Sequence, residues 1–470
     1  MNIEQAFSKD ILSEYFEKNI RLNASRGIDG ITGLVFSVDL DERLTLTSQK
    51  IFSKRYRFTP YLEIIKSKGR GKPPRIISKP TVRDKIVLFA IKEELHKLFP
   101  ECVPKRLPNT YIREIKNKIS GLDSNTHSYL KIDIKGFYDN LNRDLIQEKL
   151  KVKTDNDAFI TLIRRALLNK TVPRSYKRKD SLKYQSKVGV PQGLSISNIL
   201  AEIYMKEFDD YFSGKAIAYF RYVDDILLIS SKDNIKFLEE EVDKKLSDIG
   251  LSSHDHDDDR KSEKGSISEK FQYLGYEVSS SAISVKESTI IRFIESIVAM
   301  FTKFKHNAER QEKESKFLNI NQIKEIFILR LNEKITGAIN ENKKYGWLFY
   351  FIEINDIPLL YKLDEIIKNQ FERLSIFENK VPEKRNRSNP DGLCSLVRSY
   401  YEIRHNIFGG YIHNYNIYET RQDKLSYLVK FGYIAHYDDK SYTDEDIEKM
   451  FIEAKKSSLL RLEMDVGTIS

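Results

Sequence analysis

The chain has 470 residues, 40% hydrophobic and 31% charged, so it exceeds one typical domain and is expected to form about two to four. This composition excludes a collagen and a disulfide-stabilised miniprotein. It also excludes an integral membrane protein, because no apolar run approaches the roughly 18–20 residues that span a bilayer. The two cysteines are far apart, and the N-terminus mixes acidic and basic residues, unlike a secretory signal. We therefore expect a cytoplasmic protein without a membrane partner.

The net charge of +10 is concentrated in one part of the chain. Residues 51–120 contain 18 Lys or Arg against 6 Asp or Glu, so the remainder is close to neutral. A concentrated basic surface attracts polyanions, usually nucleic acid. Basic and aromatic residues are interleaved there: Lys54, Arg55, Tyr56, Arg57, Phe58 and Tyr61. Such a mixture suits stacking on bases, although charge alone is equally compatible with a solvated face that binds nothing.

Hydrophobic periodicity predicts mixed strands and helices in the first 290 residues. Strands are predicted over 61–66, 74–79, 129–134, in two runs within 217–230, and in a pair around 271–276. Helices are predicted over 1–25, 81–98, 140–150 and 234–249. A basic, glycine-rich turn joins the first two strands, and a polar loop is expected over 252–268.

From about residue 286 the pattern is helical to the end, with a loop near 384–392 as a domain boundary. Residues 381–470 contain 9 of the 26 tyrosines. Tyr411, Tyr415 and Tyr418 have the spacing of one helical face. Either they pack the core of a helical domain, or a tyrosine hydroxyl has a chemical role.

Three acidic residues are expected at strand ends. Asp133 lies at the end of a predicted strand, and Asp224 and Asp225 occupy the tip of a predicted hairpin. Carboxylates among apolar strands repel one another unless cations join them. Two Mg²⁺ ions would do so, and would stabilise the attacking and leaving oxygens of a phosphoryl transfer. An ordinary Asp-rich surface turn is the alternative for Asp224 and Asp225 taken alone.

Two further motifs suggest phosphate or nucleotide binding. Residues 189–198 (GVPQGLSISN) form a glycine-flanked turn that leads into a helix, where Gln192 can offer hydrogen bonds. The basic turn could hold a triphosphate through Lys66, Lys68, Arg70, Lys72 and Arg75. It lacks the Gly-Lys-Ser/Thr ending of a P-loop, and a solvated hairpin tip is an equal alternative.

The order of these motifs resembles the reverse transcriptase family. Residues 131–139 (KIDIKGFYD) are similar to its first carboxylate motif, and 222–225 (YVDD) to its metal-binding hairpin. Three more segments are similar to family motifs: 190–193 (VPQG) to the template- and nucleotide-handling motif, 271–276 (FQYLGY) to the primer grip, and 27–30 (GIDG) to an N-terminal motif of bacterial and group II intron enzymes. The resemblance spans about residues 20–290.

The resemblance implies an α+β right-hand polymerase fold in four parts. Residues 1–125 would form fingers with the basic hairpin. Residues 126–285 would form a palm with a ferredoxin-like antiparallel sheet and a finger insertion at about 151–185. Residues 286–380 would form a helical thumb, and 381–470 a mostly helical C-terminal extension.

It further implies an RNA-directed DNA polymerase, a nucleotidyltransferase that uses two Mg²⁺ ions, for which Mn²⁺ can substitute. Asp133, Asp224 and Asp225 would be catalytic and would bind the metals together with the Ile134 carbonyl. The implied nucleotide-binding residues are Lys66, Lys68, Arg75, Tyr138, Gln192 and Lys261. Those implied to contact nucleic acid are Lys54, Arg55, Arg57, Arg70 and Lys72. Tyr138 takes the position of the family's steric gate against the ribose 2′-hydroxyl, whereas Lys261 lies in a stretch that departs from the family pattern.

The chain lacks the motifs of retron enzymes, the Cys/His module of group II intron proteins and a recognisable RNase H arrangement. Its long extension, with residues 345–350 (YGWLFY) and 399–403 (SYYEI), is most similar to the abortive-infection and defence-associated reverse transcriptases of bacteria. That group implies antiphage defence with a non-coding RNA template, a DNA product, dNTPs, and a homo-oligomer or second protein subunit. Two alternatives stay open. One is DNA synthesis by the same palm that is template-independent or is primed by the protein itself, for which the resemblance allows a tyrosine hydroxyl of the extension. The other is a non-catalytic RNA-binding scaffold or maturase-like protein.

Overall fold

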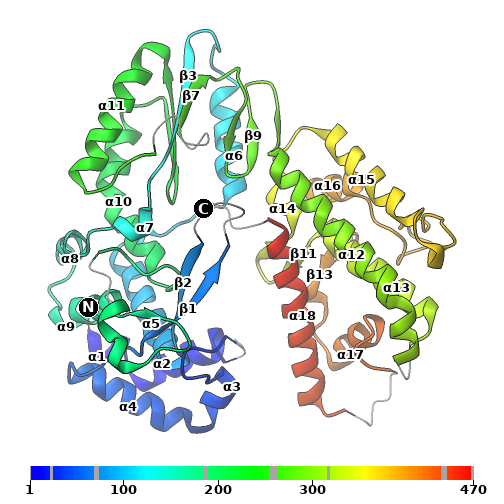
Figure 1. Cartoon of the computed structure of the whole chain (residues 1–470), viewed down its shortest axis with the longest axis horizontal. Coiled ribbons are helices and arrows are strands. Elements are labelled where there is room, and N and C mark those ends of the chain that lie inside the picture. Colours follow the sequence, from blue (N-terminus) through cyan, green and yellow to red (C-terminus); the bar gives the residue numbers. More distant parts are fainter. Residues whose placement is uncertain are drawn as a thin grey trace. The chain divides into compact units, whose positions relative to one another are not determined.

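The chain divides into two compact units, each containing segments distant in sequence (Figure 1). The computed structural model describes residues 2–21, 25–67, 74–184, 188–254, 262–314, 318–435 and 442–466. The first unit comprises residues 1–106 and 126–266, and the second comprises 107–125 and 267–470. Mixed helix and sheet confirm the predicted α+β class, whereas the four-part division stays a prediction. None of the described helices is both long and apolar enough to cross a membrane.

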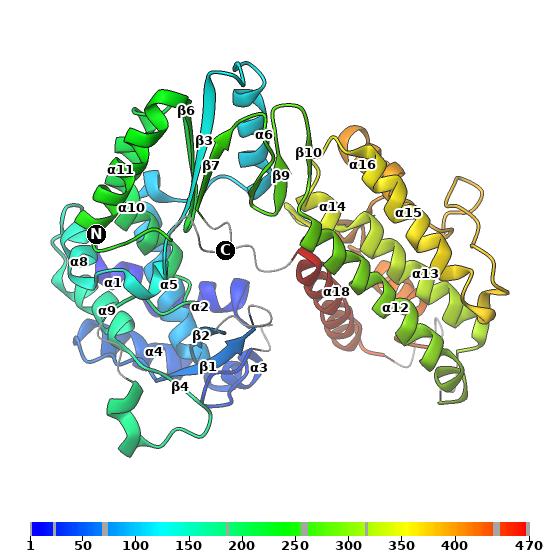
Figure 2. The same cartoon turned by 45° about the horizontal axis from the view of Figure 1, so that its top comes forward.

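A four-stranded antiparallel sheet in the order β5-β6-β3-β7 forms the centre of the first unit. Its strands are β3 (His127–Asp133), β5 (Ala218–Tyr222), β6 (Asp225–Ser231) and β7 (Glu263–Ser266). Helices α10 (Ser197–Ser213) and α11 (Lys232–Asp248) pack against it (Figures 1 and 2). The connection β3-α10-β5-β6-α11-β7 with this strand order is the ferredoxin-like arrangement expected of a palm.

Strand β7 corrects the expectation of a polar loop over 252–268. Its sequence, EKGS, carries no apolar alternation that would identify a strand. It forms because its backbone pairs with β3 from Ser128 to Lys131, on the side of β3 opposite to β6. The predicted helix over 1–25 is also wrong in detail, because it is two helices, α1 (Ile3–Ala6) and α2 (Lys9–Asn19). The Ser8 hydroxyl accepts the Ile11 N–H and starts the second one.

The predicted hairpin is confirmed as β1 (Tyr61–Lys66) and β2 (Arg75–Lys79), paired antiparallel. A third strand, β4 (Thr171–Val172), pairs parallel with β1. Further helices of the first unit are α4 (Leu40–Phe52), α5 (Val82–Leu98), α8 (Arg143–Lys151) and α9 (Asp157–Leu168).

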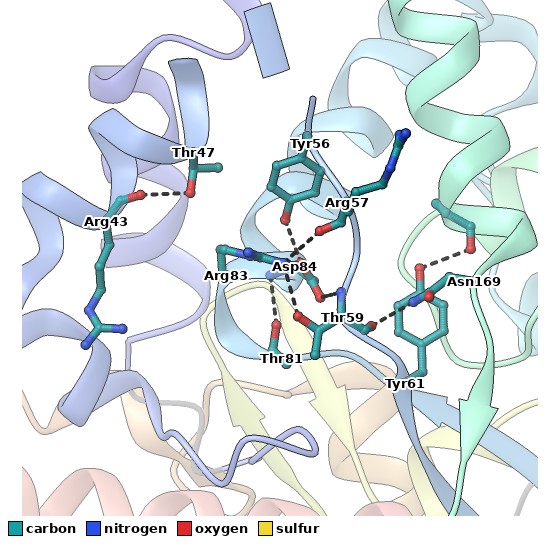
Figure 3. Close-up of polar contacts among 11 residues, drawn as sticks. Arg43, Thr47, Tyr56, Arg57, Thr59, Tyr61, Thr81, Arg83, Asp84 and Asn169 are labelled. Carbon is teal, nitrogen blue, oxygen red and sulfur yellow. Dashed lines mark hydrogen bonds and ion pairs between the residues drawn. The ribbon is translucent and has the colours of Figure 1, made fainter. Parts of the chain in front are cut away.

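A buried polar cluster holds the segment that leads into β1 (Figure 3). The Asp84 carboxylate is completely buried and accepts the Tyr56 hydroxyl at 2.6 Å and the Thr59 N–H at 2.8 Å. Arg83 donates to the same carboxylate at 2.9 Å and to the Arg57 carbonyl at 2.9 Å. The cluster therefore fixes the backbone of residues 56–59 to helix α5.

The predicted stacking of aromatic residues on bases in this segment is wrong. Tyr56, Phe58 and Tyr61 are only 1%, 8% and 0% exposed. The extended chain alternates, so the three rings enter the core while the intervening Arg55 and Arg57 face solvent. The basic side chains alone remain available to a nucleic acid.

The second unit is mostly helical, as predicted, but it contains two small sheets. One joins β8 (Phe271–Tyr273), β9 (Tyr276–Val278) and β10 (Ile283–Val285), and the other joins β12 (Lys343–Tyr345), β11 (Ala338–Asn340) and β13 (His413–Asn414). The helices are α6 (Pro108–Ile119), α12 (Glu287–Glu314), α13 (Ile320–Thr336), α14 (Trp347–Tyr350), α15 (Ile357–Phe371), α16 (Leu396–His405), α17 (Arg421–Lys430) and α18 (Asp444–Val466).

The second of these sheets overturns the expected helical face of tyrosines. Tyr411 precedes β13, and Tyr415 begins a short 3₁₀ helix, Tyr415–Ile417. Strand β13 interrupts the segment because it pairs with β11 through Ala338 and Ile339. Tyr411 and Tyr415 are both buried, and burial raises the pKa of each hydroxyl.

The Asp84 cluster generates the first prediction. Asp84→Asn should lower the free energy of unfolding of the first unit by about 3 kcal/mol, because it leaves the Arg83 charge without its buried partner. The control Asp41→Asn removes a carboxylate that is 79% exposed and should cost less than about 0.5 kcal/mol. Thermal unfolding followed by circular dichroism compares the two, and equal melting temperatures would contradict the structural role of Asp84.

Candidate active site

Strand pairing brings the three predicted catalytic acids together. In the β3–β6 ladder, Asp133 lies directly opposite Asp225. The Ile134 N–H donates to the Asp224 carbonyl at 3.0 Å, which extends the pairing past the strand ends. All three carboxylates are half-buried, at one end of a sheet whose interior is apolar. The three acidic residues that the sequence predicts to be catalytic are therefore neighbours at one end of the palm sheet, where β3 ends and β6 begins.

The tip of the β5–β6 hairpin is held by a buried arginine that sequence reasoning missed. Arg221 donates through Nε and Nη2 to the Asp209 carboxylate at 2.7 and 2.6 Å. Nη2 also donates to Glu202 at 2.5 Å, and Nη1 donates to the Val223 carbonyl at 3.0 Å. A charged residue within an apolar strand, directly before the YVDD motif, was the available signal.

Tyr138 lies beside these acids, on the short helix α7 (Phe137–Asn140) that follows β3. Its side chain is half-buried, and its hydroxyl is 3.4 Å from the Asn198 Oδ1. Burial is the main cause that raises the pKa of Tyr138, and the negative charges of Glu202 and Asp224 add to it. The negative charge of Asp224 thus acts on the Tyr138 hydroxyl.

The Pro-Gln-Gly turn connects α7 to the basic hairpin. The Val190 N–H donates to the Tyr138 carbonyl at 2.7 Å, and the Ser78 N–H of β2 donates to the Gln192 carbonyl at 2.7 Å. The Gln192 side chain also lies 3.4 Å from the Asp139 carboxylate. Gln192 therefore lies between Tyr138 and the strand that carries Arg75.

The basic hairpin is only partly covered by the described residues. Lys66 and Arg75 pair at the end of β1 and β2 that is joined by the turn, with Lys66 exposed and Arg75 partly exposed. Both can therefore approach a phosphate group from solvent. Four predicted binding residues lie outside the described residues: Lys68, Arg70, Lys72 and Lys261.

A second basic area lies around the exposed residues Lys54, Arg55 and Arg57. Arg57, Arg164 and Arg165 line a surface hollow of about 410 Å³. Arg165 donates to the Lys54 carbonyl at 2.8 Å, and burial together with the nearby Arg57 charge lowers its pKa. Sequence reasoning missed Arg164 and Arg165, although adjacent arginines in the otherwise apolar helix α9 were a visible signal.

The fit to a metal ion rests on ligand chemistry. Within the described ranges, no group of three or more His, Cys, Asp or Glu side chains is arranged to hold a metal ion. The oxygen atoms of Asp133, Asp224 and Asp225 and the Ile134 carbonyl nevertheless form the donor set that Mg²⁺ prefers. The backbone register brings these donors to one end of the palm sheet.

Comparison with protein families identifies a domain within the chain. Residues 65–278 match the family described as "Reverse transcriptase (RNA-dependent DNA polymerase)". The chain contains a reverse transcriptase domain. All three acids, Tyr138 and Gln192 fall inside the matched region of this domain, as does the basic hairpin from Ile65 onward.

Three curated relatives match parts of the chain. An "Uncharacterized 91 kDa protein in cob intron" of Schizosaccharomyces pombe is 32% identical over 184 residues, which is 37% of this chain and 21% of that protein. "Protein YkfC" of Escherichia coli is 24% identical over 46% of this chain and 66% of that protein. A "Putative COX1/OXI3 intron 1 protein" of Saccharomyces cerevisiae is 26% identical over 36% of this chain and 20% of that protein. The chain thus spans between one fifth and two thirds of the length of these relatives.

Two telomerase structures show a distant likeness. Apo telomerase from Candida tropicalis has 17% identity and a TM-score of 0.36, covering 55% of this chain and 61% of that chain. Telomerase from Candida albicans in complex with a fragment of telomeric RNA has 13% identity and a TM-score of 0.42, covering 74% of this chain and 68% of that chain.

The contact between the Pro-Gln-Gly turn and α7 generates the second prediction. Gly189 has φ +84°, and a Cβ there would lie 2.5 Å from the Asp139 carbonyl oxygen. Gly189→Ala should therefore destabilise the domain by about 2 kcal/mol and detach the turn from α7. Gly214→Ala is the control, because a Cβ at Gly214 meets nothing within 4 Å. Amide exchange at Val190 reports the detachment, and unchanged protection in Gly189→Ala would contradict the close approach.

Proposed function

We propose that this chain is an RNA-directed DNA polymerase that joins dNTPs at the site formed by Asp133, Asp224 and Asp225. The observation that carries the proposal is the β3–β6 register, which places Asp133 opposite Asp225 inside a reverse transcriptase domain. Three carboxylates at the ends of two paired strands create a site for divalent cations. Such a site supports cation-assisted phosphoryl transfer.

Each surrounding residue has a role in this proposal. Asp133, Asp224, Asp225 and the Ile134 carbonyl hold two Mg²⁺ ions, which neutralise the phosphates when bound. The cations Lys66, which is exposed, and Arg75, which is partly exposed, lie at the turn end of the hairpin and bind the triphosphate. Gln192 contacts the incoming nucleotide.

The basic area around Arg57 is proposed to bind the nucleic-acid backbone. Lys54, Arg55 and Arg57 supply exposed charge, and Arg164 and Arg165 extend that charge along helix α9. Phosphate contacts of this kind give affinity without base specificity, which suits a polymerase that must accept every template sequence.

The biological setting belongs to the proposal as well. The resemblance of the extension to defence-associated enzymes supports a partner non-coding RNA as template and a role in antiphage defence. A maturase-like RNA-binding function is the second candidate, favoured by two relatives whose names refer to introns. Priming by Tyr411 or Tyr415 is disfavoured, because a buried hydroxyl with a raised pKa is a poor nucleophile.

Loss of one carboxylate charge should stop synthesis. Asp133→Asn and Asp224→Asn should each lower the rate of primer extension by more than about 10²-fold, because the charge that binds the metals is lost at equal side-chain size. Mn²⁺ binding followed by electron paramagnetic resonance should weaken in parallel. The exposed Asp41→Asn serves as control, and full activity in either active-site variant would overturn the assignment of the site.

Tyr138 should set the choice between ribose and deoxyribose. Tyr138→Val removes the ring proposed to collide with the 2′-hydroxyl and should raise the ratio of rNTP to dNTP incorporation by at least about tenfold. Tyr138→Phe keeps the ring and loses only the hydroxyl, so its ratio should match the parent. If Tyr138→Val and the parent discriminate equally, sugar selection lies elsewhere.

A further inference from the structure

The guanidinium of Arg221 is engaged on every side although it lies in an apolar strand. Its side chain is 3% exposed. It makes two bonds to Asp209, one to Glu202 and one to the Val223 carbonyl, all between 2.5 and 3.0 Å. A planar guanidinium can satisfy these divergent acceptors at once, whereas an ammonium group cannot.

The expected contribution of Arg221 to the stability of the fold does not explain why a charged residue is buried at this position. A buried ion pair rarely stabilises a fold more than well-packed apolar residues would, because the desolvation cost offsets the attraction. Here two carboxylates share one arginine, and burial raises the pKa of Glu202 although Arg221 opposes the shift. A costly cluster beside the candidate active site is more readily explained by what it positions.

The cluster acts on a strained turn. Val223 has φ +59°, a left-handed conformation that costs a β-branched residue roughly 1–2 kcal/mol. Its carbonyl is the one that Arg221 binds, and the next carbonyl, that of Asp224, accepts the Ile134 N–H. Two hydrogen bonds therefore hold the Val223–Asp224 segment, one from β5 and one from the end of β3.

Helix α10 provides a rigid anchor for this arrangement. Asp209 and Glu202 lie two turns apart on the helix, whose apolar residues from Ile199 to Phe212 are buried in the core. The helix starts at the Pro-Gln-Gly turn, where the Ser197 hydroxyl donates to the Pro191 carbonyl at 2.6 Å. Loss of Arg221 would free the hairpin tip and leave the helix and Gln192 in place.

We propose that Arg221 is a positioning residue for DNA synthesis. Its guanidinium locks the left-handed turn at Val223 against Asp209 and Glu202, and so holds Asp224 next to the end of β3, where the Asp224 carbonyl accepts the Ile134 N–H. The proposal rests on the proposed polymerase function and adds a residue that touches neither substrate nor metal.

The test compares Arg221→Lys and Arg221→Met with the parent in steady-state primer extension. Both variants should lower kcat by about 10–100-fold, the usual effect of removing a group that orients a metal ligand. The KM for dNTP should stay within about twofold, because α10 and Gln192 do not move. Arg113→Lys is the matched control: Arg113 donates through two nitrogens to the buried Glu353 of the second unit, and this variant should keep the parental kcat.

A second substitution separates positioning from general stability. Val223→Gly in the Arg221→Lys background should restore kcat at least about fivefold, because glycine adopts φ +59° without strain. If Arg221→Met does not fold, Glu202→Gln is measured instead; it leaves the two bonds to Asp209 and should lower kcat only a fewfold.

Each possible outcome decides between these explanations. Parental kcat in the folded Arg221 variants would overturn the proposal. A loss of kcat that follows the loss of melting temperature and is not restored by Val223→Gly would make Arg221 merely structural. Full activity of Asp224→Asn would refute the proposed function itself, whereas an inactive Asp224→Asn beside fully active Arg221 variants would refute only this inference.

Discussion

The pairing register of β3 with β6 is the constraint on which the candidate site depends. Side chains alternate between the two faces of a sheet, so a slip of one residue would turn Asp133 to the opposite face from its present position. The buried residues on β3 and β6, such as Leu130 and Leu228, make that slip costly because they would leave the core. The apolar interior of the palm thus determines where the carboxylates lie, and the proposed cations would offset their mutual repulsion.

Three further contacts connect the rest of the first unit to that edge. Arg221 connects the tip of the β5–β6 hairpin to α10, and the Pro-Gln-Gly turn connects α7 to β2. Asp84 connects residues 56–59 to α5. Each contact uses buried polar groups whose loss leaves a partner unsatisfied, so each is specific in geometry as well as stabilising. The proposed metal, nucleotide and template contacts are therefore positioned by one connected framework.

Most of the fold in the first unit could be predicted from the sequence because its elements have strong local signals. The β1–β2 hairpin, helix α5 and the β5–β6 hairpin carry clear periodicity and turn residues. The features that were missed depend on partners distant in the chain. Strand β7 exists through pairing with β3, and the burial of Tyr56 and Tyr61 depends on Asp84 and the Ala166 carbonyl. The role of Arg221 was likewise invisible, since its carboxylate partners lie 12 and 19 residues earlier.

Template-dictated incorporation tests the central claim most directly. The purified full-length chain is given poly(rA) with an oligo(dT) primer, or poly(rC) with an oligo(dG) primer, Mg²⁺ and one dNTP at a time. The account predicts extension by dTTP alone on the first template and by dGTP alone on the second, and none after chelation of the metal. Incorporation that ignores the template would indicate template-independent synthesis, and a folded protein that binds both templates but extends neither would contradict an active polymerase.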